Sequence, residues 1–143
     1  MFERKTGGVA LLNKDHNLLI VKEIGSEKWG FPKGCLEEQD NNSWFNCALR
    51  ELYEETLIDL KQHSYEIINV FNKNKLYIYL INIDKNVDIQ HSKLEIMEYK
   101  WISSNNLLSD IHKNYYKYNS SIKCFIKSIN KRLNSSLKEL FKN

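Results

Sequence analysis

The sequence predicts a layered domain of the α/β or α+β class, and three observations lead to this prediction. Short β-rich runs occur in pairs within residues 6–23 and 65–83, a segment with helical periodicity separates the pairs, and a long amphipathic segment ends the chain. Strands and helices in this order pack as layers, with helices covering a sheet. The chain has 143 residues, 42% of them hydrophobic and 27% charged, so we expect one globular domain over residues 1–143.

The first two strands are predicted at residues 6–13 and 17–23, where the apolar runs TGGVALLN and NLLIVKE are split by KDH. The following segment contains four residues that exclude a helix, namely Gly25, Gly30, Pro32 and Gly34. Within it, WGFPKG at residues 29–34 predicts a tight turn. Such a turn would bring backbone carbonyls close to a ligand held by the next helix.

The central helix is predicted from about Ser43, its N-cap, to Ile58. Two β-rich runs at 65–71 and 75–83 are joined by NKN, which predicts a hairpin. A further strand and a short helix are predicted after it, at residues 98–102 and 105–110.

The last helix is predicted over about residues 119–142, and it is amphipathic. Its apolar side chains recur at a spacing of three and four and predict a face that packs on the rest of the domain. They are Ile122, Phe125, Ile126, Ile129, Leu133, Leu137 and Leu140. Its lysines, which we call the lysine stripe, are Lys123, Lys127, Lys131, Lys138 and Lys142. The stripe is either a track for a phosphate backbone or a solvated face, and the pattern leaves both open.

The charge of the chain is uneven. Residues 111–143 carry eight basic residues and one acid, a net charge of +7, so the remainder carries −4 within a total of +3. An acidic body with a basic end suits a protein that holds cations and also meets a polyanion.

Several classes of protein are disfavoured by the sequence. The N-terminal MFERKTGG lacks the layout of a secretory signal, and no apolar run approaches the roughly 18–20 residues that span a bilayer. Cys35, Cys47 and Cys124 are odd in number and show no CxxC spacing, which argues against a disulfide partner and a zinc site. We therefore expect a soluble, cytoplasmic protein without a membrane partner, and a nuclear location is not excluded.

Four charged residues stand close together in the central helix, namely Arg50, Glu51, Glu54 and Glu55. Residues three and four apart are neighbours on a helix, so the three carboxylates project to one side and repel one another. A hard divalent cation relieves this repulsion, because Mg²⁺ prefers oxygen ligands and binds through a few carboxylates and substrate phosphates. Arg50 is placed to orient a carboxylate by paired hydrogen bonds. Acidity alone is more typical of a solvated helix face than of a metal site, and it is the preceding WGFPKG segment that favours the metal site.

The spacing of these residues resembles the signature of the Nudix hydrolases. The order of residues from 34 to 58 is similar to the Nudix box: it reads Gly34, five residues, Asp40, nine residues and then RELYEETLI. That box reads Gly, five residues, Glu, seven residues, and Arg-Glu-apolar-x-Glu-Glu-x-Gly-apolar. The likeness covers residues 34–58, and the order of the flanking elements extends it to nearly the whole chain. It implies a Nudix fold, with a mixed β-sheet sandwiched between helices, a catalytic loop–helix–loop and a long amphipathic C-terminal helix.

Three positions depart from the box. Asp40 stands in place of the loop Glu, or the role of that Glu falls to Glu37 or Glu38. The spacer before Arg50 is two residues longer than in the box. Leu57 replaces a glycine at the end of the helix, where glycine eases a left-handed turn. All three helix glutamates are retained.

Carried over position by position, the resemblance implies a site for Mg²⁺ or Mn²⁺. Its ligands would be Glu51, Glu54, Glu55 and the backbone carbonyl of Lys33 or Gly34. Arg50 would position Glu51. The cations would bridge phosphates and lower the pKa of an attacking water, which implies a hydrolase of nucleoside diphosphates linked to another moiety.

Within the family, WGFPKG and ELYEETLIDL resemble the mRNA-decapping branch. In that branch a loop glutamate shortly before a tryptophan is a general base or an extra metal ligand, and Glu95, six residues before Trp101, fits this spacing. Glu98 is the second candidate, but alternation through Glu98 and Lys100 predicts that it lies on an exposed strand face. The basic last helix adds to the resemblance, because it would guide the body of a capped RNA.

The resulting hypothesis is a metal-dependent decapping enzyme that acts on capped RNA. Its catalytic residues would be Arg50, Glu54, Glu55 and Glu95. Its substrate-binding residues would be Trp29, Lys33, Lys123, Lys127 and Lys131. Two alternatives stay open: a hydrolase of diadenosine polyphosphates or diphosphoinositol phosphates, and a Nudix-fold binding module with weak catalysis.

Overall fold

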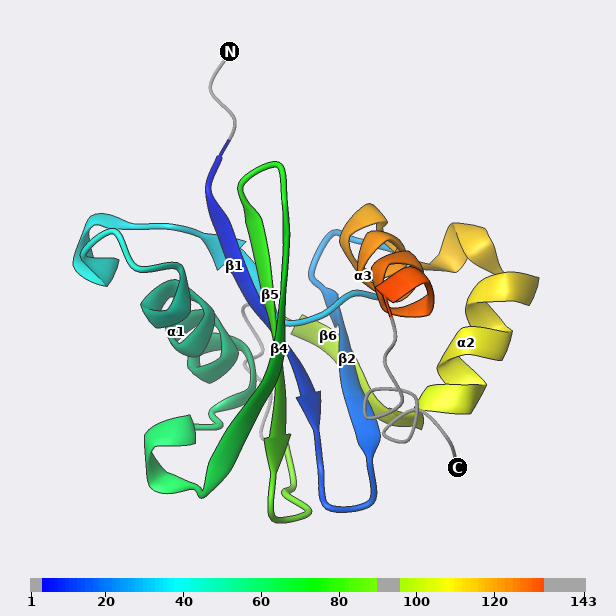
Figure 1. The fold of residues 1–143 in the computed structure, drawn as a ribbon, viewed down its shortest axis with the longest axis horizontal. Helices are drawn as coiled ribbons and strands as arrows, with labels where there is room; N and C mark the ends of the chain where they lie inside the picture. Colours follow the sequence, from blue (N-terminus) through cyan, green and yellow to red (C-terminus); the bar gives the residue numbers. More distant parts are fainter. Residues whose placement is uncertain (1–3, 90–95, 133–143) are drawn as a thin grey trace.

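The computed structural model describes residues 4–89 and 96–132, with the backbone alone for Met97 and residues 130–132. Figure 1 shows these residues as three layers, in which helices cover both faces of one sheet. The predicted α+β fold with a mixed sheet between helices is therefore confirmed. Within the described ranges, no helix is both long enough and apolar enough to cross a membrane.

The sheet is mixed and has six strands. Their bounds are β1 (Thr6–Leu12), β2 (Asn17–Glu23), β3 (Lys33–Cys35), β4 (Tyr65–Lys73), β5 (Leu76–Ile83) and β6 (Ile96–Ser103). The order is β4-β5-β1-β2-β6, with β3 paired to β1. The β1–β5 pair is parallel and the other pairs are antiparallel. Both predicted strand pairs are confirmed, since β1 pairs with β2 and β4 forms a hairpin with β5.

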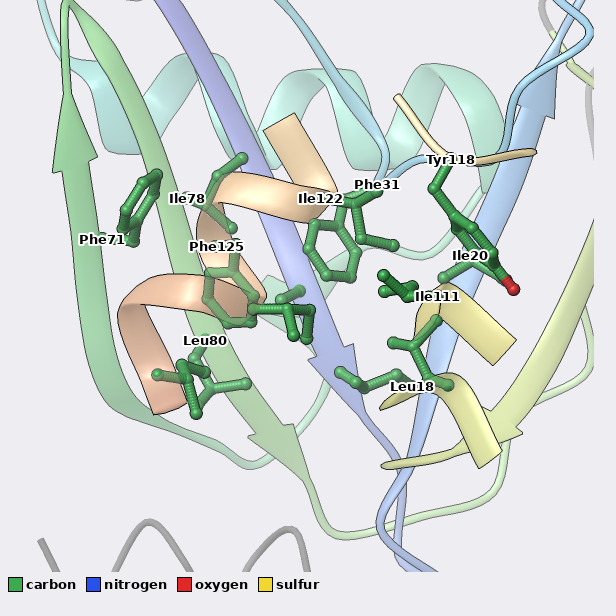
Figure 2. Packing of buried hydrophobic residues seen from close by; sticks show 14 of the residues in the cluster. Leu18, Ile20, Phe31, Phe71, Ile78, Leu80, Ile111, Tyr118, Ile122 and Phe125 are labelled. Atoms are coloured by element: carbon green, nitrogen blue, oxygen red, sulfur yellow. The ribbon is translucent and has the colours of Figure 1, made fainter. Parts of the chain in front are cut away.

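Each face of the sheet carries its own core because side chains alternate along a strand. In β1, Val9 and Leu11 point toward α1 (Trp44–Thr56), whereas Ala10 and Leu12 join the cluster under α2 and α3. Figure 2 shows the second cluster. There Phe125 makes edge-to-face contacts with Phe31 and Phe71, at ring centroid distances of 5.1 and 6.0 Å. α1 and the α2–α3 pair are thus held on opposite faces.

The helices lie close to their predicted positions. α1 begins after Ser43, whose hydroxyl accepts a hydrogen bond from the Asn46 N–H at 3.1 Å, so the predicted N-cap is confirmed. The remaining helices are α2 (Ser104–Lys113), longer than predicted, and α3 (Ser120–Arg132). The first half of the predicted apolar face of α3 is buried, as expected: Ile122, Phe125, Ile126 and Ile129. Leu133, Leu137, Leu140, Lys138 and Lys142 lie outside the described residues.

The prediction of a tight turn at WGFPKG is wrong. Trp29 and Gly30 form bridges to Tyr118 and Val21, and the segment continues into β3. Pro32 favours this extended path, because a proline disfavours the helical region for the residue before it. Its carbonyl accepts a hydrogen bond from the Val9 N–H at 3.0 Å, which joins the segment to β1.

Candidate functional site

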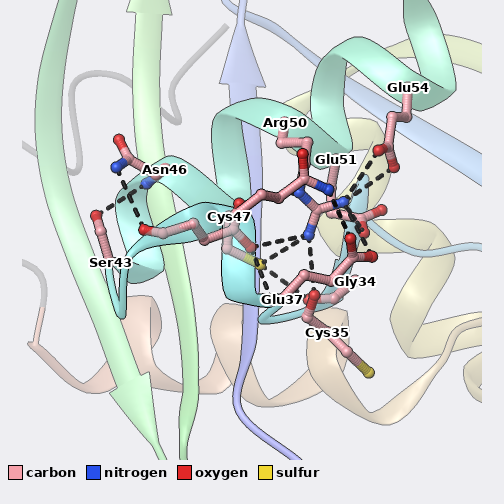
Figure 3. Close-up of polar contacts among 11 residues, drawn as sticks. Gly34, Cys35, Glu37, Ser43, Asn46, Cys47, Arg50, Glu51 and Glu54 are labelled. Carbon is pink, nitrogen blue, oxygen red and sulfur yellow. Dashed lines mark hydrogen bonds and ion pairs between the residues drawn. The ribbon is translucent and has the colours of Figure 1, made fainter.

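Arg50 is the centre of a polar cluster on α1 (Figure 3). Its Nε and Nη2 donate to Oδ1 and Oδ2 of Asp40 at 2.9 and 3.0 Å, which makes a bidentate pair. Its Nη1 donates to Glu51 Oε1 at 3.0 Å and to both oxygens of Glu54 at 3.0 and 3.1 Å. Nη2 also donates to the Cys35 carbonyl at 3.0 Å. One guanidinium thus holds the loop, the end of β3 and two carboxylates of its own helix.

Asp40 is the loop carboxylate that pairs with Arg50. It ends a short 3₁₀ turn, Glu38–Asp40, and only 2% of it is exposed. The backbone N–H of Glu37 donates to its Oδ2 at 2.9 Å. Of the two other candidates, Glu37 lies 3.5 Å from Nη1 with a half-exposed side chain, and Glu38 is exposed. The longer spacer continues after Asp40 through two asparagines with left-handed φ, at 53° and 61°.

The electrostatics of the cluster follow from this pairing. The hydrogen bonds from Arg50 hold the pKa of Asp40 below its ordinary value, and the same pair raises the pKa of Arg50. Both groups are therefore ionised at neutral pH. The four carboxylates that contact Arg50 outnumber its single positive charge. The cluster keeps an excess of negative charge, which favours a cation.

Gly34 lets Glu51 lie directly against the backbone of β3. A Cβ added to Gly34 would be 2.1 Å from the Glu51 carboxyl carbon, so only glycine fits there without displacing Glu51. Gly34 pairs with Gly7 of β1, and its carbonyl accepts a hydrogen bond from the Cys47 thiol at 3.3 Å. Hydrogen bonding alternates along an antiparallel pair, and the Pro32 carbonyl points to β1. The intervening Lys33 carbonyl therefore points to the outer edge of β3.

Glu55 occupies a position on α1 that faces the sheet. The buried residues of the helix are Cys47, Ala48, Leu52, Glu55 and Thr56. Glu55 is 2% exposed, and both of its carboxylate oxygens are buried. Placing a carboxylate on the core side of a helix costs several kcal/mol unless hydrogen bonds or a cation offset the lost hydration. Such a position disfavours the interpretation of a solvated helix face.

The residues fit a hard divalent cation by their number and kind. The carboxylates of α1 lie next to β3, whose backbone contacts Glu51 at Gly34. The Lys33 carbonyl at the outer edge of β3 adds an oxygen of the kind that such a cation prefers. Within the described part of the chain, no three acidic, cysteine or histidine side chains converge as a metal-holding group. Glu51 and Glu54 are turned toward Arg50 instead. Metal binding requires these two side chains to give up part of their contact with the guanidinium.

The family of a chain with this arrangement is given by the protein-family model that matches its sequence. The family model of the NUDIX domain matches residues 1–121, which include the β1–β3 segment, the Arg50 cluster and α1. The chain belongs to the Nudix family. The predicted family is therefore confirmed, and Nudix hydrolases generally use divalent metal ions.

Relatives of this Nudix chain include hydrolases that are named for acting on RNA. The RNA pyrophosphohydrolase of Pelagibacter ubique (strain HTCC1062) is 28% identical over 122 residues, which cover 70% of this chain and 76% of that protein. The mRNA-decapping enzyme subunit 2 of Saccharomyces cerevisiae (strain YJM789) is 28% identical over 127 residues. That match covers 81% of this chain and 13% of the yeast protein. With the family match, these relatives support a Nudix pyrophosphohydrolase.

A solved structure supports the fold of the Nudix chain. The crystal structure of a C. elegans Ap4A hydrolase in a binary complex matches it with a TM-score of 0.58 at 19% sequence identity. The match covers 75% of this chain and 85% of that one. At this identity the likeness concerns the fold alone.

Two glutamates were predicted as candidates for the extra catalytic carboxylate, and the structure describes one of them. Glu95 lies outside the described residues. Glu98 lies on β6, is exposed and forms an ion pair with Lys22 at 3.3 Å, as strand alternation predicted. Glu98 is therefore engaged on the α2–α3 side of the Nudix sheet, away from α1.

The predicted substrate-binding residues of the Nudix chain lie on the face opposite α1. A Cβ on Gly8 would meet Lys33 Cβ and Ile78 Cδ1, which places the Lys33 side chain with the core under α3. Trp29 also contacts this core. In the lysine stripe, Lys123 Nζ lies 3.8 Å and Lys127 Nζ 6.0 Å from the ring centroid of Tyr115. The Lys131 side chain is outside the described residues. A substrate that contacts both the carboxylates and these residues must pass an edge of the sheet.

Two residues of the site, Gly7 and Cys47, were not recognised from the sequence as part of it. A Cβ on Gly7 would lie 2.6 Å from the Trp44 carbonyl oxygen, so the backbone of α1 rests directly on β1. Burial raises the pKa of the Cys47 thiol to about 11, and this neutral thiol donates to the Gly34 carbonyl. The Gly-Gly pair within a predicted strand was the available signal, because glycine in a strand marks a close approach of another backbone.

Proposed function

We propose that this Nudix chain hydrolyses a pyrophosphate bond in a nucleoside-diphosphate-linked substrate and that this substrate is capped RNA. The observation that carries the hydrolase proposal is the buried carboxylate of Glu55, one helical turn after Glu51 and next to the Arg50 cluster. A buried carboxylate beside further acidic groups suits a cation-dependent site better than a stable core.

The proposed division of roles follows the contacts. Glu51, Glu54, Glu55 and the Lys33 carbonyl would hold Mg²⁺ or Mn²⁺. A bound cation supplies charge neutralisation at the phosphates and a water of lowered pKa. Arg50 acts as the positioning residue, because it holds Glu51 and Glu54 by hydrogen bonds and is itself fixed by Asp40. Glu95 is proposed as the additional catalytic carboxylate.

Capped RNA is favoured over a small nucleotide by two further points. The relatives that match over 70% and 81% of this chain are named for pyrophosphohydrolysis of RNA and for mRNA decapping. Lys123 and Lys127 on α3 provide cations beyond those needed at a metal site, and a long polyanion gains more from them than a dinucleotide does.

A substrate panel tests the proposal. Purified protein is incubated with a long capped RNA, free cap dinucleotide, diadenosine tetraphosphate and a diphosphoinositol phosphate, each with Mg²⁺ or Mn²⁺. We expect release of a nucleoside phosphate from capped RNA, and slower cleavage of the free cap dinucleotide. Glu55→Gln should lower kcat by about 100-fold or more, since metal-assisted charge stabilisation is worth several kcal/mol.

The matched control is Glu38→Gln, which makes the same chemical change at an exposed position in the loop before α1. It should retain full activity. Full activity of Glu55→Gln would contradict the metal assignment, and equal cleavage of cap dinucleotide and long RNA would contradict capped RNA as the substrate. Absence of hydrolysis across the panel would favour a binding module.

A further inference from the structure

A cavity lies away from the carboxylates, on the α2–α3 face of the sheet. Its volume is about 500 Å³, and its lining residues are Lys22, Glu27, Lys28, Trp29, Tyr116 and Lys117. Lys22 follows Ile20 by two residues on β2, and Ile20 belongs to the core under α2 and α3, which fixes the face. This volume is within the range of small-ligand pockets. We call it the Trp29 pocket.

The walls of the Trp29 pocket are tied to each other by backbone hydrogen bonds. The Trp29 N–H donates to the Lys117 carbonyl at 2.8 Å, and the Asn119 N–H donates to the Trp29 carbonyl at 2.9 Å. These bonds join Trp29, in the connection between β2 and β3, to η3 (Tyr115–Lys117), the short turn before α3, and to Asn119 beyond it. The backbone therefore fixes the Trp29 wall of the pocket against the Lys117 wall.

The pocket is basic, and part of its charge is held in place. Lys22 Nζ and Lys100 Nζ lie 4.9 and 4.7 Å from the ring centroid of Trp29. Cations at this distance from an indole are attracted to its face. Three lysines, Lys22, Lys28 and Lys117, line the pocket against one acid, Glu27. Lys22 is also paired with Glu98 at 3.3 Å, and Lys100 lies beside it on the Trp29 ring, so the four lysines still exceed the two acids and an anion is favoured there.

The rim of the pocket presents aromatic rings next to lysines. Tyr116 is 69% exposed and Tyr115 is 48% exposed, although both are large rings in a short turn. Tyr115 precedes the pocket residue Tyr116 in η3, and Lys123 Nζ of α3 lies 3.8 Å from the Tyr115 ring centroid, so η3 joins the pocket to the lysine stripe. Rings that stack bases, set among cations that neutralise phosphates, are the recurrent combination for binding single-stranded nucleic acid.

We infer that the Trp29 pocket binds one nucleotide of a single-stranded RNA, with the base stacked on Tyr116 and the phosphates on Lys28 and Lys117. The inference rests on the proposed function in one respect, that RNA is the substrate. β3 connects the two places: Gly34 faces Glu51 on one side of the strand, and the neighbouring Lys33 side chain points to the other side, where the pocket lies. The RNA body would cross the edge of β3 and continue toward α3.

Binding of an RNA that cannot be cleaved tests this inference independently of hydrolysis. A fluorescent single-stranded RNA with a 5′-hydroxyl contains no pyrophosphate, and its affinity for the full chain is measured by anisotropy over a salt series. Tyr116→Ala should weaken binding by about tenfold, and Tyr116→Phe should retain it, because one stacked base is lost only in the first variant. Removing Lys28 and Lys117 together, by substitution with Ala, should lower the slope of log affinity against log salt by about 1.4.

The matched control removes Lys14 and Lys85, which are exposed neighbours at the other end of β1. It makes the same change in net charge and should alter the affinity by less than about twofold. Equal losses in the two double variants would show binding by overall charge and would overturn the inference. Unchanged affinity in Tyr116→Ala and in the Lys28/Lys117 variant would also overturn it. Intact RNA binding without hydrolysis of any panel substrate would refute the proposed function and leave this site standing.

Discussion

Asp40→Asn is the substitution that tests the Arg50 cluster most directly. The Asp40 carboxylate accepts three hydrogen bonds, two from Arg50 at 2.9 and 3.0 Å and one from the Glu37 N–H at 2.9 Å. Asparagine keeps one acceptor oxygen but turns an NH₂ group toward a donor of Arg50 or Glu37. One charged hydrogen bond is lost, and a buried donor faces another donor. Hydrogen bonds to charged groups contribute about 1.5–3 kcal/mol, so the free energy of unfolding should fall by about 2–4 kcal/mol.

The effect of Asp40→Asn should depend on pH with a definite sign. The pKa of Asp40 is lowered in the folded state, mainly by the hydrogen bonds from Arg50. Its charge therefore stabilises the fold fully above the ordinary Asp pKa, about 3.9, and this contribution is lost as the pH falls from there through the lowered pKa. The stability gap between wild type and Asp40→Asn should be constant from about pH 5 to 7 and should narrow only below about pH 4.

Urea titrations of both proteins between pH 3 and 7 measure this gap, and thermal unfolding at pH 7 should show a Tm lowered by about 6–14 °C. Glu38→Gln is the control, because Glu38 is an exposed acid in the same short turn, and its loss should change the unfolding free energy by less than about 0.5 kcal/mol. A cost below about 0.5 kcal/mol for Asp40→Asn, or a gap that does not narrow in acid, would refute the reasoning.

Three further predictions concern the same site. Gly34→Ala should lower kcat by about tenfold or more with little loss of stability, because the new Cβ would lie 2.1 Å from the flexible Glu51 carboxyl carbon. Steady-state kinetics and a urea titration measure the two effects, and an unchanged kcat would contradict the close contact. Leu57 has a left-handed φ of 63°, which strains any residue with a Cβ but not glycine. The free energy of unfolding of Leu57→Gly should therefore be about 1 kcal/mol higher than that of Leu57→Ala, which keeps the strain. Equal free energies would argue against strain. Millimolar Mg²⁺ should raise the Tm of wild type and not that of Glu55→Gln, because a ligand of the folded state stabilises it; equal shifts would remove Glu55 from the ligand set.

The strands and helices were predictable where the pattern is local. The β4–β5 hairpin and the N-cap of α1 follow from residues a few positions apart, and both are confirmed. β3 was missed because its three residues carry no periodicity of their own, and it exists through pairing with β1, more than twenty residues earlier. A short strand of this kind is specified by its partner.

The site was predictable in part for a similar reason. Glu51, Glu54 and Glu55 were found because helical spacing and the family signature are both properties of one short segment. Which loop acid takes the place of the box Glu stayed open among Asp40, Glu37 and Glu38, and the pairing of Asp40 with Arg50 was not deduced, since a loop has no periodicity from which to deduce the direction of a side chain. The Gly7 contact with α1 was likewise not deduced, although the Gly-Gly pair marked the place.

The sequence by itself determined the Nudix family, the acidic helix with its arginine and the amphipathic character of the last helix, because each of these is encoded in spacing along one segment. The tertiary structure decided that Asp40 fixes Arg50, that Glu51 lies against Gly34, that Glu55 is buried, and that Lys33 and Trp29 lie on the opposite face of the sheet from α1. These facts depend on which segments pack together and on the face that each strand presents. Contacts between residues distant along the chain set both, and a one-residue change of register would reverse them.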